Sequence, residues 1–463
     1  MTPVTKLPGD VGAIHFVGIG GIGMSGIAEL LLNLGYRVSG SDLAATEITK
    51  NLADLGGTIY QGHAADQISG ADVVVTSSAV TDDNPEVLAA QQVAVPVIPR
   101  AEMLAELMRL KYSVAIAGAH GKTSTTSLVA EVLAAGGLDP TVVIGGKLMG
   151  LGTNAVLGRG DFIVAEADES DGSFLKFTPT LAVVTNIDRE HLDFYRDLDE
   201  IKSAFLTFID RIPFYGLAIL CLDNEAVQDL IPRVKKRFIT YGLSNQADLQ
   251  ATNIQFEGLK TRFNVSGPKE SYGQILLNRA GQHNVLNALA SIAVGLELDI
   301  SFDRIKRALE AVSGVGRRLE IKGEFDGMTI VDDYGHHPSE IQTTLSAIRT
   351  SWPGRRIVVV FQPHRYTRTR ALFDEFARSF YQSDVVVVLP IYAASEEPIE
   401  GVTGKSLYEE IRRHGHKDVR YAMNKKGAVR FLLDTVTQGD LVLTLGAGDV
   451  YQVGEMLVER LSP

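Results

Sequence analysis

In "YSVAIAGAHGKTSTT", residues 112–126, an apolar run gives way to glycines, a lysine and hydroxyl residues. A strand that ends in a glycine-rich turn and continues into a helix directs main-chain amides at a phosphate. The usual loop reads G-x-x-x-x-G-K-[ST], but position 116 holds Ile116 and the nearest glycine, Gly118, comes two residues later. The sequence therefore predicts a phosphate site with a shortened loop.

A second glycine-rich turn lies in "AIHFVGIGGIGMSG", residues 13–26. Gly18, Gly20 and Gly23 satisfy G-x-G-x-x-G between a predicted strand and a predicted helix, and Asp42 ends the following strand. This pattern is typical of a pyrophosphate cradle in which an acid accepts a hydrogen bond from a ribose hydroxyl. The motif indicates a diphosphate but not the compound that contains it, so a dinucleotide and a UDP-sugar both fit.

Composition limits the possible functions. The chain has 463 residues, 45% of them hydrophobic, which suffices for about three domains at ~150 residues each. Its 56 acidic and 44 basic residues give a net charge of −12 without a basic run, so we expect no nucleic-acid partner. We find neither a membrane span nor a signal segment, and the single cysteine, Cys221, suits a reducing compartment. We therefore expect no membrane insertion and a cytoplasmic location.

Short apolar runs alternate with helical patterns in three series, which predicts an α/β fold of parallel sheets covered by helices. We expect a Rossmann-like N-terminal domain (1–110), a central P-loop ATPase-like α/β domain (111–317) and a Rossmann-like C-terminal domain (318–463). Residues 249–277 alternate polar and apolar residues between turn formers, which predicts a small antiparallel addition to the central domain.

Metal-binding groups follow the strands of the central series. Lys122 would hold phosphate oxygens and the Thr123 hydroxyl would meet Mg²⁺. Glu166 and His191 follow predicted strands, and ligands of such sheets gather at the carboxyl ends of the strands. Both suit a Mg²⁺ shell, although Mg²⁺ prefers oxygen ligands. A turn with an incidental lysine and solvated acids is the alternative.

Polar clusters recur where a fold alone needs none: "GQHNVLN" (281–287), "GRRLE" (316–320), "DDYGHHP" (332–338) and "FQPHRYTRTR" (361–370). Arginine forks suit carboxylates and phosphates. Helix capping would equally explain Asn284, and a solvated basic turn would explain the arginines.

In combination, "GAHGKTSTT", "EADESDGSF", "TNIDREHLD", "GQHNVLNALA", "GRRLE" and "DDYGHHPSE" resemble the ATP-dependent muramyl ligases, which build the peptide of bacterial peptidoglycan precursors. The resemblance runs from about residue 13 to 455, and that family has the short phosphate loop. The N-terminal segments are most similar to the member that adds L-alanine to UDP-N-acetylmuramate. Ala119 departs from a common threonine, which matters little because such a loop works through its backbone.

The resemblance implies that ATP phosphorylates the lactyl carboxylate of UDP-N-acetylmuramate and that the amine of L-alanine attacks the acyl phosphate. It implies ATP and two Mg²⁺ ions as cofactors, closure of the third domain over the second, and a monomer or homodimer. The base for the amine stays open, with His191 as a candidate.

Roles of single residues follow from the same resemblance. The implied catalytic residues are Lys122, His191, Arg318, His364, Arg365 and Arg368. The implied ATP-binding residues are Gly118, Ala119, His120, Gly121, Lys122, Thr123, Ser124, Asn284, Asn287, Asp333 and His337. The implied UDP-sugar-binding residues are Gly18, Gly20, Gly21, Gly23, Ser41, Asp42, Ser77 and Ser78. The implied metal ligands are Thr123, Glu166 and His191.

Three other functions fit part of the sequence. An NAD-dependent dehydrogenase would use the first glycine motif but leave the second loop and the arginine clusters without a role. A folate-polyglutamate-type ligase shares the ATP loop but needs no N-terminal UDP-sugar domain. A non-catalytic nucleotide sensor would release no phosphate.

Overall fold

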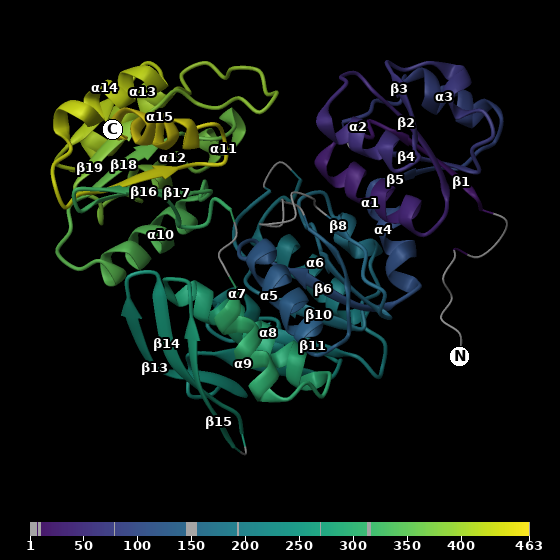
Figure 1. Cartoon of the computed structure of the whole chain (residues 1–463), viewed down its shortest axis with the longest axis horizontal. Helices are drawn as coiled ribbons and strands as arrows, with labels where there is room; N and C mark the ends of the chain where they lie inside the picture. The colour runs from purple at the N-terminus through teal and green to yellow at the C-terminus, as the bar shows by residue number, and fades with distance from the viewer. Residues whose placement is uncertain are drawn as a thin grey trace. The chain divides into compact units, whose positions relative to one another are not determined.

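The computed structural model describes residues 7, 11–77, 79–144, 155–191, 194–268, 270–312 and 316–462. They form three β-sheets with flanking helices (Figure 1). The chain makes two compact units. Unit 1 contains residues 1–252, 264–273 and 286–311, and unit 2 contains 253–263, 274–285 and 312–463. The α/β fold class is confirmed, whereas the boundaries at 110 and 317 stay predictions.

The first sheet has five parallel strands in the order β3-β2-β1-β4-β5. Its strands are β1 (Ala13–Val17), β2 (Arg37–Asp42), β3 (Thr58–Gln61), β4 (Val73–Thr76) and β5 (Val97–Pro99). Its helices are α1 (Ile22–Asn33), α2 (Glu47–Asp54), α3 (Pro85–Gln92) and α4 (Arg100–Arg109). The strand order reverses at β1, and ligands of open α/β sheets bind beside such a switch point. The first glycine turn lies there because it directly follows β1.

The second sheet has ten strands in the order β15-β14-β13-β12-β11-β10-β6-β9-β7-β8. Its strands are β6 (Tyr112–Ala117), β7 (Thr141–Val143), β8 (Ala155–Val156), β9 (Phe162–Glu166), β10 (Leu181–Val184), β11 (Leu217–Cys221), β12 (Phe238–Gly242), β13 (Leu249–Glu257), β14 (Lys260–Ser266) and β15 (Ser271–Leu277). Its helices are α5 (Lys122–Ala135), α6 (Leu198–Asp210), α7 (Glu225–Gln228), α8 (Gln282–Glu297) and α9 (Phe302–Ala311). Only two residues link the neighbours β13 and β14, so these strands run antiparallel, as predicted.

The third sheet has six strands in the order β16-β17-β21-β18-β19-β20. Its strands are β16 (Glu320–Phe325), β17 (Met328–Asp333), β18 (Ile357–Phe361), β19 (Val385–Val388), β20 (Val419–Tyr421) and β21 (Leu441–Leu445). Its helices are α10 (Pro338–Ser351), α11 (Tyr366–Ala371), α12 (Phe373–Ala377), α13 (Gly404–Arg413), α14 (Lys425–Thr435) and α15 (Tyr451–Leu461). In β18, Val359 and Phe361 enter one apolar core while Val358 and Val360 enter the other. Burial on both faces explains the continuous apolar runs of this region.

Two strands were not expected from the sequence. The short strand β8 pairs antiparallel with β7, and β16 pairs antiparallel with β17 at the edge of the third sheet. All six residues of β16 are at least partly exposed, so its sequence lacks the apolar run that marks the central strands.

A buried aromatic cluster anchors the loop that follows β9. The ring of Phe174 lies 5.2 Å from that of Phe205 and 5.2 Å from that of Phe208, both on α6, and all three side chains are fully buried. The Phe174 amide also donates to the carbonyl of Asp168, at 3.1 Å. The segment after β9 is therefore fastened to the core of unit 1.

We expect Phe174→Ala to destabilise the chain by ~3–5 kcal/mol, because it removes a buried ring and leaves a cavity. Urea unfolding measures the change. The control is Phe214→Ala, since Phe214 is 91% exposed and should shift stability by about 0.5 kcal/mol at most. Equal midpoints for the two variants would contradict the anchoring role.

Candidate active site

The phosphate loop connects β6 to α5 and is closely packed. Gly118 has φ +138° and Gly121, the N-cap of α5, has φ +81°. A Cβ on Gly121 would lie 2.7 Å from Oδ1 of Asn287, and one on Gly118 would lie 2.9 Å from the carbonyl oxygen of Asn186. Both the left-handed backbone and the space thus require glycine. The adjoining residues Ala119, Thr123 and Ser124 complete the turn and open the helix.

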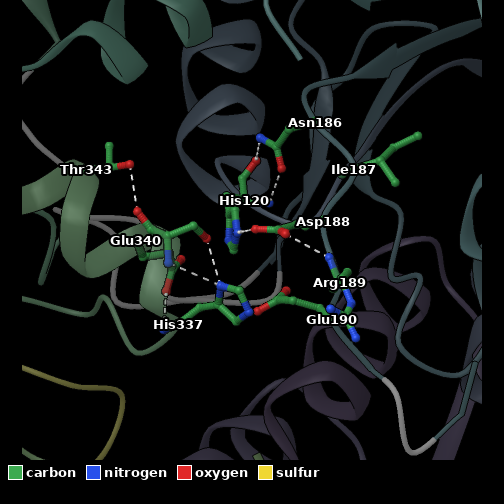
Figure 2. A network of polar contacts seen from close by, with 12 residues as sticks. His120, Asn186, Ile187, Asp188, Arg189, Glu190, His337, Glu340 and Thr343 are labelled. Carbon is green, nitrogen blue, oxygen red and sulfur yellow. Dashed lines mark hydrogen bonds and ion pairs between the residues drawn. The ribbon is translucent and has the colours of Figure 1, made fainter. Parts of the chain in front are cut away.

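The end of β10 supports this loop. The His120 amide donates to Oδ1 of Asn186 at 2.8 Å, and the Asn186 side-chain amide donates back to the His120 carbonyl at 2.9 Å. The His120 ring lies 3.0 Å from a carboxylate oxygen of Asp188 (Figure 2). These bonds hold the loop in one shape and commit the amide of His120 to Asn186.

The ammonium of Lys122 is already paired. Its Nζ lies 2.8 Å from Oε1 and 3.0 Å from Oε2 of Glu169, and it donates to the Gly118 carbonyl at 2.6 Å. Burial alone would lower the pKa of Lys122, but the attraction of Glu169 outweighs it and raises that pKa. Burial would likewise raise the pKa of Glu169, and the attraction of Lys122 holds it below its usual value. A nucleotide phosphate must therefore compete with Glu169 for Lys122.

A carboxylate–imidazole cluster adjoins this ion pair. Ligand atoms of Glu169, Glu190 and His191 all lie within 4.8 Å of one another, a geometry that could hold a cation. His191 Nε2 is 3.7 Å from Glu169 Oε1, and His191 has φ +56°, which is strained for a residue with a Cβ. The structure thus brings the predicted ligand His191 beside two acids that were not predicted.

One cavity of about 130 Å³ within unit 1 is bordered both by α1 and by Lys122, the first residue of α5. Gly23 of α1 lines it together with Lys122 and the predicted metal ligand Glu166. Arg100 and Asp168 line it as well, and neither was predicted. The first turn of α1 and the first residue of α5 therefore border one shared space.

The first glycine turn is closed by hydrogen bonds to β2. The amides of Gly18 and Ile19 donate to the Ser41 carbonyl, each at 2.9 Å, and the Gly20 amide donates to Oδ2 of Asp42 at 2.8 Å. The Gly21 amide donates to the carbonyl of Gly18 at 3.2 Å. Asp42 thus shapes the turn, in addition to any contact with a ribose.

The Ser41 hydroxyl faces the protein interior. It donates to Oε2 of the fully buried Glu86 at 2.6 Å and lies 2.9 Å from Nδ1 of His63. This network was not predictable from the sequence, because Glu86 looks like an ordinary acid in the first turn of a helix. Ser77, also expected to bind the UDP-sugar, lies near Gly18, at 3.8 Å from a Cβ built there, and Ser78 falls outside the described residues.

In unit 2 the two arginines of "GRRLE" differ. Arg317 donates to Oδ2 of Asp332 at 2.9 Å and to the carbonyls of Gly446 at 2.6 Å and Gly448 at 3.0 Å. It therefore fixes the turn before α15. Arg318, the predicted catalytic residue, lies 3.7 Å from Glu340 and remains about one-third exposed. Its looser setting suits a residue that meets a phosphate.

The predicted nucleotide residues of unit 2 are well packed. Asp333 is buried and accepts bonds from the amides of Leu319 and Gly335, both at 2.9 Å, and burial raises its pKa. His337 is the N-cap of α10. Asn284 is the third residue of α8 and donates to the Ala280 carbonyl at 2.7 Å, so the capping alternative for Asn284 is wrong.

The basic segment after β18 is built around an imidazole. The ring of His364 stacks on that of Tyr392, with centroids 5.4 Å apart, and its Nδ1 lies 3.3 Å from Nη1 of Arg368. Arg365, the N-cap of α11, has φ +70° and ψ +137°, a strained conformation of the kind that gathers at functional sites. The structure thus brings two of the predicted catalytic residues, His364 and Arg368, together.

Comparisons with known proteins agree with this geometry. The chain matches three Mur ligase sequence families: the catalytic domain over residues 13–112, the middle domain over 116–295 and the glutamate ligase domain over 317–448. The chain belongs to the Mur ligase family. This confirms the resemblance and the three-domain α/β architecture of a Mur ligase.

Relatives of this Mur ligase are similar over nearly its whole length. The UDP-N-acetylmuramate–L-alanine ligase of Desulfatibacillum aliphaticivorans is 66% identical, with 97% of this chain and 99% of the relative covered. The enzyme of the same name from Geobacter sulfurreducens is 59% identical, with 98% of each chain covered. The crystal structure of the Thermotoga maritima UDP-N-acetylmuramate–alanine ligase is 31% identical, covers 97% of this chain and 98% of that one, and superposes with a TM-score of 0.79. Within the described ranges, no helix is both long and apolar enough to cross a membrane.

We expect Gly121→Ala to abolish nucleotide binding, because its Cβ would press on Asn287 and distort the loop. Gly137→Ala is a matched control: Gly137 has nearly the same φ, +82°, beyond the end of the same helix, but a Cβ there meets open space. Titration with an ATP analogue measures both variants. Equal losses of affinity would show that backbone strain alone, rather than the fit of the loop, is responsible.

We expect unit 2 to lose stability as pH falls from about 7 to about 4. Burial lowers the pKa values of His283 and His364 to about 4 and that of His336 to about 3, against ~6.5 in an unfolded chain. The unfolded state therefore binds more protons in this range, and the free energy of unfolding decreases with decreasing pH. Urea midpoints at pH 7 and 5 measure the decrease. His336→Asn should make it smaller, and an unchanged decrease would contradict the assignment.

Proposed function

We propose that this Mur ligase joins L-alanine to the lactyl carboxylate of UDP-N-acetylmuramate at the expense of ATP, in the synthesis of peptidoglycan precursors. The observation that carries the proposal is the shared cavity, into which the first turn of α1 and Lys122 of the phosphate loop both open. A ligase that uses ATP to phosphorylate the carboxylate of a UDP-sugar must hold both nucleotides beside one space. The relatives at 59–66% identity carry the name of this activity.

Activation of the acid comes first. A carboxylate oxygen of the lactyl group attacks the γ-phosphorus of ATP, the bond to the β-phosphate oxygen breaks, and ADP leaves. Such a transfer depends on positioning and charge neutralisation rather than on covalent help. Lys122 would supply positive charge at the phosphates once they replace Glu169, and the first-turn amides of α5, which lack intrahelical partners, would face them.

Amide formation follows. The amine of L-alanine attacks the acyl carbon, the tetrahedral intermediate expels inorganic phosphate, and the nitrogen gives its extra proton to a base. His364, Arg365 and Arg368 would orient the carboxylate of alanine, since guanidinium groups bind carboxylates through paired hydrogen bonds. Arg318 would meet the transferred phosphate.

The residues of unit 1 fit Mg²⁺. Thr123, next to Lys122 in the chain, and Glu166, which lines the cavity with Lys122, would supply oxygen ligands. Glu169 and Glu190 would supply carboxylates close to His191. When bound, the metal neutralises charge on the phosphoryl oxygens. Two ions, a cytoplasmic location, and a monomer or homodimer complete the proposal.

Phosphate release is the direct test of this proposal. With ATP and UDP-N-acetylmuramate present, we expect release only when L-alanine or a similarly small amino acid is added, because the amine must consume the acyl phosphate. Each amino acid is assayed in turn. Release that requires a UDP-muramyl peptide would assign the chain to another step, and a change in nicotinamide absorbance would favour a dehydrogenase.

We expect Lys122→Met to reduce the rate by a factor of ~10²–10³, because loss of one preorganised electrostatic partner costs ~3–4 kcal/mol of barrier. The steady-state rate at saturating ATP measures the loss. Lys306→Met is the control, since Lys306 lies on α9 in a surface pair with Glu310. A Lys122→Met enzyme with the wild-type rate would refute the role of the loop.

A further inference from the structure

Arg100 is a cation of the shared cavity that the predicted site residues do not include. It is the first residue of α4, and its side chain lies against the first turn of α1. A Cβ on Gly23 would lie 3.0 Å from the Arg100 Cζ, so the guanidinium occupies the space that a larger residue would fill. This contact explains the third glycine of the first motif. It also places a guanidinium beside the predicted diphosphate cradle.

The present partner of Arg100 holds it weakly. Nη2 lies 4.0 Å from Oδ2 of Asp168, and the two side chains are 32% and 47% exposed. Ion pairs of this kind contribute only ~0–1 kcal/mol. Lys122, in contrast, is held by Glu169 at 2.8 Å. Arg100 can therefore exchange Asp168 for a ligand anion at little cost.

We propose that Arg100 binds the diphosphate of the UDP-sugar; this rests on the function proposed above. The first turn of α1 leaves amides without intrahelical partners and carries the positive end of the helix dipole, which together attract a phosphate. Arg100 contacts that same turn at Gly23, and a guanidinium fork binds two phosphate oxygens at once. The diphosphate displaces Asp168 from Arg100 and accepts hydrogen bonds from both the first-turn amides of α1 and the guanidinium.

The lactyl carboxylate is the other anion that the cavity receives. That carboxylate has to reach the γ-phosphate at Lys122, whereas the guanidinium of Arg100 lies against Gly23 of the diphosphate cradle. Position therefore favours the diphosphate. The two anions are separable by experiment, because UDP and UDP-N-acetylglucosamine contain the diphosphate without the lactyl group.

Calorimetric titration of the full chain tests the proposal with uridine, UDP, UDP-N-acetylglucosamine and UDP-N-acetylmuramate. We expect Arg100→Gln to reduce the affinity for the last three ligands about tenfold to a hundredfold, as for loss of a charged hydrogen bond. The affinity for uridine should stay unchanged. Arg100→Lys should fall between the wild type and Arg100→Gln. Arg109→Gln is the control, because Arg109 ends the same helix in an exposed pair with Glu106.

Three results would overturn the assignment. Unchanged affinity for UDP in Arg100→Gln would refute the contact, and a loss confined to UDP-N-acetylmuramate would assign Arg100 to the carboxylate instead. If both Arg100 variants lost affinity for uridine as much as for UDP, the substitutions would act on the domain in general rather than on the diphosphate contact. Failure of the proposed function looks different, because the wild-type chain itself would then not bind UDP.

Discussion

A largely buried ammonium needs a counter-charge, and Glu169 supplies it to Lys122, whose side chain is only 18% exposed. The glycines at 118 and 121 let the loop turn tightly, so that the Lys122 ammonium donates to the carbonyl of Gly118 within the same loop. The end of β10 fixes the loop through Asn186. A positive group is thus held ready at the amino end of α5, with an internal acid in the position that a phosphate would take.

The two acids that pair with Arg100 and Lys122 are adjacent in the chain. Asp168 lies near Arg100, beside the first turn of α1, and Glu169 binds Lys122 of the phosphate loop. The buried ring of Phe174 anchors the same segment to α6. One short, well-anchored loop therefore supplies the negative charges that pair with both cations of the shared cavity. A change in this loop would alter the electrostatic environment of Arg100 and of Lys122 together.

The sequence predicted those parts of the molecule that depend on local rules. Strands buried on both faces appear as apolar runs, and the two glycine turns are visible because their backbone tolerates only glycine, as Gly121 shows. Partner choice was not predictable, because it depends on residues far apart in the chain. Nothing local marks Glu169 as the partner of Lys122, or distinguishes Arg317, which fixes a turn, from Arg318. The interior orientation of the Ser41 hydroxyl likewise depends on Glu86, 45 residues away.

The proposed function requires two nucleotides to occupy two separate turns and to meet in one cavity. A crystal structure of the chain with UDP-N-acetylmuramate and a non-hydrolysable ATP analogue tests it most directly. We expect the diphosphate over residues 18–23, the triphosphate over residues 118–124, and Lys122 bound to phosphate instead of Glu169. Both nucleotides in one turn, or an unbroken Lys122–Glu169 pair beneath a bound triphosphate, would contradict it.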